Sequence, residues 1–510
     1  MTLEKTSAPL YEALLHYREG KKKSFHVPGH KNGQVYADTQ EAELLRDVMM
    51  IDATEITGLD DLHHPEGAIE KAQTLAADCF GAAESFLLVG GSTAGNLAMI
   101  LSVCTEPGDI LLVQRNVHKS VVHGLMLSGA QAVFLTPHVD EYSGLPVAPL
   151  TTTIAAALSA YPNAKGVLLT MPNYYGMGSD LTPAAELCHQ YGVPLLVDEA
   201  HGAHYGLHAG LPASALSCGA DGVVQSTHKM LPAMTMGAML HVQGDYLDRT
   251  LIRQRLAMLQ SSSPSYPLMA SLDLARRHVH VLGAEAFEEG LRAVEAMKEG
   301  LKQLPRFGFI EPSPSDGQRG YTSQDPFKIS VYDREDVWSG YELQNQLEQA
   351  GCVPEMSDDR YVVLLFTLGS KMEDTIHLLQ ALTHIHAQMV KARVFTEESK
   401  TVEEETGQAP NLIFSTWNNT SVSNYSLPVR FSIQPQNAAY IEAIPVEQAA
   451  GRISAEMVIP YPPGIPILYA GEKISAGMVA QLLRLSHHRV KCQGCADASL
   501  HTVRVMQQQI

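Results

Sequence analysis

Seven short apolar segments, separated by longer amphipathic stretches, constrain the fold of this 510-residue chain more than any other feature. They are rich in valine, leucine and isoleucine and cover residues 85–89, 110–113, 132–135, 167–170, 193–197, 222–225 and 237–242. Strands buried on both faces have this character, and helical stretches between them favour parallel connections. We therefore predict an α/β domain with a mostly parallel sheet, whose ligands bind beyond the carboxyl ends of the strands.

The rest of the chain predicts smaller α+β units. Long helices are expected across residues 272–304, followed by strands at 327–332 and 360–367 that alternate with helices at 341–350 and 372–390. The polar stretch 397–410 predicts a linker, and the proline-rich stretch 459–466 cannot lie inside a helix. We predict an N-terminal segment and three domains, with bounds at residues 1–65, 66–285, 286–396 and 412–510.

Charge and composition exclude several classes of protein. The net charge of −19 disfavours a nucleic-acid partner, and the absence of a long apolar run predicts no membrane span. Seven scattered cysteines and no secretory leader predict a cytoplasmic protein. Cys492 and Cys495 form a CxxC pair, but no second ligand pair has suitable spacing, so we predict no metal site.

A lysine and an aspartate follow two of the predicted strands. Lys229 comes directly after Ser226-Thr227-His228, and Asp198 closes the segment 193–197, where an unpaired carboxylate is costly to bury. A lysine in apolar surroundings has a lowered pKa and therefore a usable free amine. Pyridoxal 5'-phosphate chemistry needs such a pair, because the amine condenses with the cofactor aldehyde and the carboxylate keeps the pyridine nitrogen protonated.

Other polar residues fit the same cofactor. Ser92 and Thr93 lie in a glycine-rich turn that opens a helix, which is either a phosphate site or an ordinary helix cap. His118 follows another strand and is either a ring that stacks on the cofactor or a solvated loop residue. In the HGAH motif we expect His201 to face the ring or the substrate and His204 to be structural.

These residues belong to motifs that together resemble the fold-type-I pyridoxal-phosphate enzymes, and among them the bacterial Orn/Lys/Arg decarboxylase family. The motifs extend over most of the chain: PGHKNG at 28–33, DDLHHPEG at 60–67, GGSTAGN at 90–96, RNVHKS at 115–120, VDEAHGAH at 197–204, STHKM at 226–230, SSSPSY at 261–266 and PYPPGIP at 460–466. The resemblance implies a homodimer or higher homo-oligomer with its site at the interface, which residues 261–266 would reach. PGHKNG begins at residue 28, which implies the short form without an N-terminal wing.

The resemblance also implies roles and an activity. Lys229 would bind the cofactor, Asp198 would face the pyridine nitrogen and His118 would stack on the ring. Four residues would hold the phosphate: Ser92, Thr93, Ser226 and His228. We expect Lys229 and Asp198, together with His201, to be the catalytic residues. The implied reaction is decarboxylation of arginine, lysine or ornithine to the amine and CO2, as in polyamine biosynthesis.

Other functions use the same cofactor-binding residues. An aminotransferase or α-oxoamine synthase would do so, and Arg360 could then hold a substrate carboxylate, as in aminotransferases. A catalytically silent, cofactor-binding regulator is a further alternative. A dibasic substrate needs an acid for its distal cation, and Glu456, Glu355 and Asp358 are candidates whose position the sequence does not determine.

Overall fold

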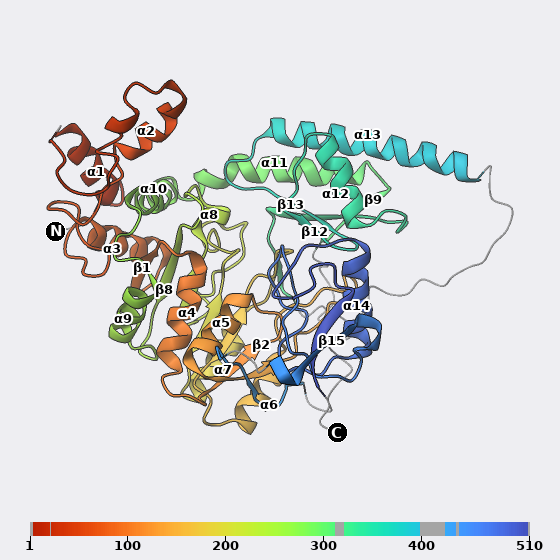
Figure 1. Cartoon of the computed structure of the whole chain (residues 1–510). Coiled ribbons are helices and arrows are strands. Elements are labelled where there is room, and N and C mark those ends of the chain that lie inside the picture. The colour runs from red at the N-terminus through yellow and green to blue at the C-terminus, as the bar shows by residue number, and fades with distance from the viewer. Residues whose placement is uncertain (1–3, 21, 312–320, 398–423, 435–437, 508–510) are drawn as a thin grey trace.

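A computed structural model of the chain describes residues 4–20, 22–311, 321–397, 424–434 and 438–507, and its centre is an eight-stranded sheet (Figure 1). In spatial order the strands are β1 (Glu84–Leu88), β8 (Ala238–Val242), β7 (Gly222–Gln225), β6 (Leu195–Asp198), β4 (Val167–Thr170), β2 (Ile110–Gln114), β3 (Gln131–Leu135) and β14 (Val429–Arg430). The five strands from β7 to β3 are parallel. Strand β8 is antiparallel to both of its neighbours, and β14 is antiparallel to β3.

The predicted large domain is confirmed in its strands and its mostly parallel sheet. All seven apolar segments form strands, with ends that differ from the predicted ones by at most two residues. Helices α4 (Gly91–Val103), α5 (Lys119–Ser128) and α9 (Arg249–Leu259) pack on one face, and α6 (Thr151–Ala160) and α7 (Thr182–Gln190) pack on the other. On strand β2, Leu111 and Val113 face the first layer and Leu112 faces the second. Both faces are therefore buried, which explains the continuous apolar runs.

The small α+β domain follows two long helices, α10 (Tyr266–Leu282) and α11 (Glu285–Lys302). Its antiparallel sheet has the order β12 (Met356–Ser357), β13 (Val362–Leu365), β11 (Lys328–Asp333) and β9 (Phe307–Phe309). Helices α11, α12 (Gly340–Gln349) and α13 (Met372–Glu397) share a core with this sheet, and α11 lies beside α13 (Figure 1). The predicted strands and helices of this region are confirmed. Strand β10 (Ser323–Gln324) pairs with β5 (Met177–Gly178) of the large domain.

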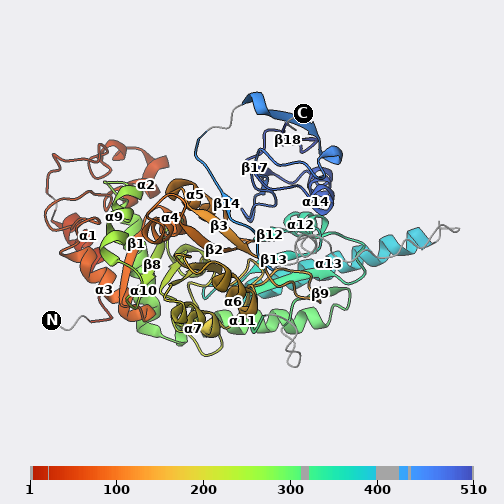
Figure 2. The ribbon, with the colours of Figure 1, turned by 90° about the horizontal axis from the view of Figure 1, so that it is seen from below.

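The C-terminal residues form a separate lobe (Figure 2). It contains the strand pairs β15 (Ile441–Pro445) with β18 (Thr502–Met506) and β16 (Ile459–Pro460) with β17 (Cys492–Gln493), and helix α14 (Ala476–His487). Short 3-10 helices cover Ala438–Tyr440 and Val446–Gln448. The proline-rich stretch forms β16 and a turn, so the prediction that it is not helical is confirmed. The predicted linker lies outside the described residues except for its first residue, and the four-part division stays a prediction.

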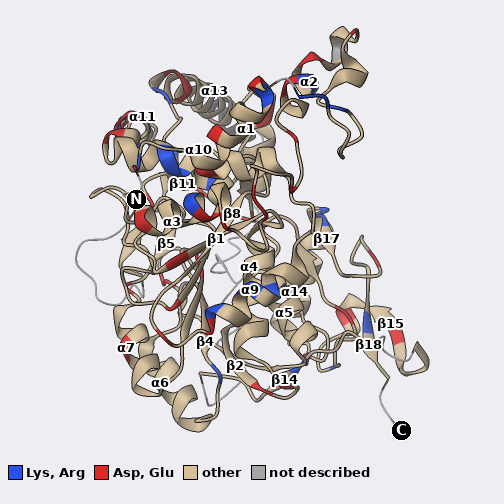
Figure 3. Ribbon diagram, turned by 90° about the vertical axis from the view of Figure 1, so that its left-hand side faces the viewer, with Lys and Arg blue, Asp and Glu red and all other residues tan. Residues whose placement is uncertain are grey.

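The N-terminal segment packs on the large domain through helix α1 (Pro9–Glu19), whose Leu10 and Leu14 share a core with α3 (Ala68–Phe80) and α10. Short helices follow at Gln34–Tyr36, Gln40–Ala42 and α2 (Glu43–Met49). Among the helices that the structure describes, none has the length and apolar character needed to cross a membrane. In the view of Figure 3, acidic and basic residues are interspersed over the elements.

Candidate active site

A cavity of about 530 Å³ lies where β4, β6 and β7 end, at the edge of the sheet that the sequence predicted for a ligand. Its walls come from the large domain, from the loop before β12 in the small domain and from the turn after β16 in the C-terminal lobe. It brings together eight of the predicted site residues: Ser92, Thr93, His118, Asp198, His201, Ser226, His228 and Lys229. Residues from widely separated segments therefore form one pocket.

Asp198 is the last residue of β6, and its side chain is buried. One carboxylate oxygen accepts a hydrogen bond from Asn96 Nδ2 at 2.8 Å, and the other accepts from the backbone N–H of Ala200 at 3.2 Å. Burial raises the pKa of Asp198, against the lowering effects of Asn96 and the Lys229 charge. A buried carboxylate in this position is suited to a cationic ligand group. Asn96 belongs to the GGSTAGN motif, but no local pattern in the sequence indicates this contact.

Lys229 lies in the short helix α8 (Thr227–Met230), which follows β7. Its Nζ lies 2.9 Å from Nε2 of His201 and 5.6 Å from the centre of the Tyr174 ring. Burial lowers the pKa of Lys229, while the charges of Asp198 and Glu355 oppose that shift. Removal from water thus increases the share of free amine, which is the form that attacks an aldehyde.

A candidate anion site lies at the start of α4. Gly91 has a positive φ of 72°, which suits glycine and lets the chain turn into the helix. The hydroxyl groups of Ser92 and Ser226 are 2.9 Å apart, and Thr93 lies beside them on the cavity wall. Hydroxyl groups beside the unpaired N–H groups of a helix start are typical of phosphate sites. His228 completes this side of the cavity, with Nδ1 2.9 Å from the carbonyl oxygen of Gly237.

His118 presents a flat, neutral ring to the cavity. It precedes α5 and caps that helix, because its Nδ1 accepts from the backbone N–H of Ser120 at 3.2 Å. Burial, reinforced by the charges of Lys229 and Lys119, lowers the pKa of His118 to about 3. An uncharged imidazole held by a helix cap is suited to stacking on a heteroaromatic ring.

The C-terminal lobe closes the cavity with Tyr461, Pro462, Pro463 and Ile465. The carbonyl oxygen of Gly464 accepts from the backbone N–H of Lys119 at 3.0 Å. Gly464 has a φ of 87°, and a Cβ on it would lie 3.0 Å from the His118 ring, so a larger residue would displace that ring. The proline-rich motif was predicted only to be non-helical, and its position on the cavity wall was not predicted from the sequence.

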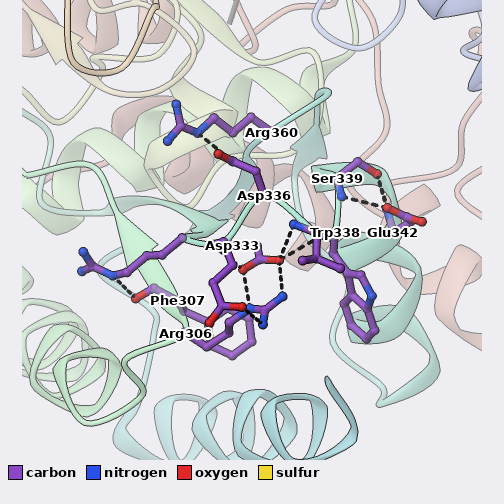
Figure 4. Close-up of polar contacts among 11 residues, drawn as sticks. Arg306, Phe307, Asp333, Asp336, Trp338, Ser339, Glu342 and Arg360 are labelled. Carbon is purple, nitrogen blue, oxygen red and sulfur yellow. Dashed lines mark hydrogen bonds and ion pairs between the residues drawn. The ribbon is translucent and has the colours of Figure 1, made fainter. Parts of the chain in front are cut away.

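Arg360 and Glu456 lie outside the cavity. Arg360 lies over the ring of Tyr332, and its Nε is 3.8 Å from Asp336 in the small domain (Figure 4). Glu456 is buried in the C-terminal lobe, where it accepts from the backbone N–H groups of Ala496 and Arg504. Within one chain both residues therefore have other partners, and neither reaches the predicted substrate site.

Three other acidic or basic residues mentioned in the sequence analysis have defined positions. Glu355 lines the cavity, whereas Asp358 accepts hydrogen bonds from Tyr175 and from the backbone of its own loop. His204 is fully buried, with its Nε2 3.1 Å from Asp325. Tyr174 and Lys328 contact His201, and neither was predicted from the sequence to lie at the site.

The CxxC pair does not touch the cavity. Cys492 and Cys495 are free thiols in and beside β17, and burial raises the pKa of both. No group of three or more histidine, cysteine or acidic side chains that could hold a metal ion occurs among the residues that the structure describes.

Comparison with models of known protein families identifies the family to which this chain belongs. A model for the major domain of Orn/Lys/Arg decarboxylases matches residues 8–317, and a model for their C-terminal domain matches residues 423–501. The chain belongs to the Orn/Lys/Arg decarboxylase family. Membership of this family identifies the reaction class as decarboxylation of a basic amino acid. The aminotransferase alternative needed Arg360 to bind a substrate carboxylate, and Arg360 does not line the cavity.

Individual relatives agree with this assignment. The chain is 33% identical over 504 residues to an arginine decarboxylase of Bacillus subtilis, with 98% of each chain covered. It is 43% identical over 492 residues to a protein of the same organism called uncharacterized protein YaaO, with 96% of each covered. The crystal structure of Francisella novicida lysine decarboxylase LdcF shares the fold, with a TM-score of 0.77 at 21% identity, and covers 98% of this chain and 81% of its own.

Proposed function

We propose that this decarboxylase binds pyridoxal 5'-phosphate in the cavity, with Lys229 as the residue that condenses with the cofactor aldehyde. The observation that carries the proposal is the convergence of Lys229 and Asp198 on one pocket with the anion site at the start of α4. Each part of the cofactor has a matching group. The phosphate fits Ser92 and its neighbours, the flat ring fits His118, and the protonated pyridine nitrogen fits the buried carboxylate of Asp198.

An unpaired hydroxyl group supports this fit. Thr170 is the last residue of β4 and pairs in register with Asp198. Its Oγ1 is buried and has no hydrogen-bond partner among the residues that the structure describes, although the residue lines the cavity. Buried hydroxyl groups are normally satisfied, so this atom is suited to a polar group of the ligand.

When bound, the cofactor supplies an electron sink for the electrons that loss of CO2 leaves behind. The protein supplies orientation and charge. Asp198 stabilises positive charge on the ring nitrogen, and the hydroxyl groups near α4 hold the phosphate. Tyr461 and the prolines beside it exclude water from the reacting centre. Lys229 and His201, in contact at 2.9 Å, can hold the proton that replaces the carboxyl group.

The proposed substrate is arginine, lysine or ornithine, and the relatives at 33% identity named arginine decarboxylases make arginine the first to test. We propose that Glu355 binds the distal cation. It is the one acidic residue besides Asp198 on the described cavity wall, and it comes from the small domain, just before β12. Its side chain is exposed, which is suited to a mouth where a charged group enters.

The experiment is to incubate the cofactor-loaded protein with each amino acid and identify agmatine, cadaverine or putrescine by mass. Glu355→Gln is expected to raise KM for the preferred substrate about 10- to 100-fold, because it removes a charged hydrogen bond of about 1.5–3 kcal/mol. Glu186→Gln, a change of an exposed acid on α7 away from the cavity, is the matched control. Formation of none of the three amines by the loaded protein would contradict the proposed function.

We also propose that the enzyme works in the cytoplasm as a homodimer, in polyamine biosynthesis, with residues 261–266 reaching the neighbouring subunit's site. The support is the family resemblance. Within one chain, this segment packs against the DDLHHPEG motif. The backbone of Ser261 contacts His63, and Tyr266 donates to the backbone of Asp60. Sedimentation of the loaded protein would measure the oligomeric state.

A further inference from the structure

Lys328 lies behind the proposed site and contacts the same histidine ring as Lys229. It is the first residue of β11, and its side chain is buried. Its Nζ donates to the carbonyl oxygen of Tyr174 at 3.1 Å and lies 2.9 Å from Nδ1 of His201. The other ring nitrogen, Nε2, lies 2.9 Å from Nζ of Lys229. One imidazole thus connects a lysine of the small domain with the lysine proposed to bind the cofactor.

The hydrogens available to these three groups restrict their protonation. A neutral imidazole has one N–H and one acceptor nitrogen, whereas an ammonium group donates three hydrogens and accepts none. Burial and the charges of both lysines hold the pKa of His201 well below its usual value, so the ring is neutral. A neutral ring cannot accept from two ammonium groups. At least one of Lys229 and Lys328 is therefore a neutral amine when both contacts are hydrogen bonds.

Lys328 is suited to be the neutral partner. Burial lowers the pKa of Lys328 to about 7, so above that pH its amine is mostly neutral. A neutral amine has a lone pair that can accept an N–H hydrogen bond, and it can still donate to the carbonyl oxygen of Tyr174. The charged groups that face it are Asp325 before β11 and Glu355 before β12, which oppose the shift, and Lys229, which reinforces it. Lys229 faces Asp198 and Glu355, and both charges favour its ammonium form.

We propose that Lys328 is a positioning residue that accepts the Nδ1–H of His201 and turns the unprotonated Nε2 of that ring toward Lys229. A proton can then pass from Lys229 to Nε2 of His201, while the Nδ1 proton passes to Lys328. The net result is that Lys229 loses one proton and Lys328 gains one, while His201 changes from the Nδ1–H to the Nε2–H tautomer. The Lys229 amine is then free to react with an aldehyde. This inference rests on the proposed function of Lys229.

The direct test is the tautomer of His201 in the cofactor-free protein, read from ring ¹⁵N chemical shifts of labelled histidine at pH 8. The signal is assigned by its loss in His201→Gln. The wild-type ring is expected as the Nδ1–H tautomer. Lys328→Arg replaces the acceptor with a group that only donates, so this variant is expected to give the Nε2–H tautomer. Lys328→Met removes the acceptor but leaves the Lys229 ammonium as the donor to Nε2, so its ring is expected to keep the Nδ1–H tautomer. Lys302→Met, on the exposed side of α11, is the control and keeps the wild-type signal.

A kinetic measurement separates this role from a merely structural one. Lys328→Met is expected to lower kcat about 10- to 100-fold and to change KM less than about threefold, since substrate contacts remain. Cofactor condensation with the cofactor-free variant should slow by a similar factor. The Nδ1–H tautomer in Lys328→Arg would overturn the inference. A kcat of Lys328→Met equal to that of the wild type would also overturn it, and this measurement decides if the arginine variant does not fold. A protein with the expected tautomer that fails to bind the cofactor would instead overturn the proposed function.

Discussion

Arg115 attaches the C-terminal lobe to the large domain, and its removal should open the cavity. Its buried guanidinium binds both carboxylate oxygens of Glu472 at 2.8 and 2.9 Å and donates to the carbonyl oxygens of Pro466 and Ile467 at 3.2 Å. It also stacks on Tyr469 at 3.9 Å. These contacts hold the segment that follows the proline-rich turn of the cavity wall.

The free-energy cost of Arg115→Leu arises because the substitution leaves the Glu472 carboxylate without its ion-pair partner. Breaking a buried ion pair by removing one partner costs about 3–5 kcal/mol. The Glu472 side chain is 23% exposed and can recover some water, so we expect about 3 kcal/mol. If this free energy stabilises the lobe against local opening, backbone hydrogen exchange across residues 459–467 should accelerate roughly hundredfold. KM should rise as well, because the wall formed by Tyr461 loses its support.

The matched variant is Arg115→Leu combined with Glu472→Leu. Removing both charges leaves no stranded carboxylate, so the double variant should exchange more slowly than Arg115→Leu alone. Hydrogen exchange followed by mass spectrometry of the cofactor-free proteins measures both rates. Equal exchange in the wild type and Arg115→Leu, or faster exchange in the double variant than in the single one, would refute this account of the lobe.

Three further predictions concern the site. Lys229→Ala should lower decarboxylation at least about a thousandfold with unchanged circular dichroism, and near-normal turnover would contradict its role. Asp198→Asn should lower kcat about a hundredfold or more without lowering the melting temperature of the cofactor-free protein, because it removes a buried carboxylate whose pKa burial has raised. In the folded protein the pKa of Lys328 is about 7, below the ordinary lysine value of 10.5. Between pH 7 and pH 10.5 the unfolded chain therefore binds a proton that the folded chain does not. The free energy of unfolding consequently increases as the pH rises through this range. Between pH 7 and pH 9 the unfolding free energy of the wild type should rise by about 2 kcal/mol more than that of Lys328→Met. If the unfolding free energies of the two proteins change with pH in parallel, the lowered pKa of Lys328 is contradicted.

Local sequence patterns predicted the strands, and they named eight residues that the structure brings together in one cavity. Asp198 is the last residue of an apolar strand, and Lys229 lies four residues beyond the end of the next one. Parallel strands bring their carboxyl ends to one edge of the sheet, so the local pattern was sufficient to bring these two residues together. Ser92 was also predictable from the local sequence, because it lies in a glycine-rich segment where a helix begins after a strand.

Contacts between domains could not be predicted in this way. Lys328 opens a strand of the small domain, and only the packing of that domain against the loop after β6 brings it to His201. Glu355 was one of three acidic candidates, and nothing in its local sequence separates it from Glu456, which is satisfied inside the C-terminal lobe. Their positions depend on tertiary geometry.

The central claim is a covalent bond between Lys229 and the cofactor aldehyde. The most direct measurement is borohydride reduction of the protein loaded with pyridoxal 5'-phosphate, followed by peptide mapping by mass spectrometry. The account predicts one reduced pyridoxyl adduct, on Lys229. An adduct on Lys328 or Lys119 instead, or no adduct at all, would contradict it.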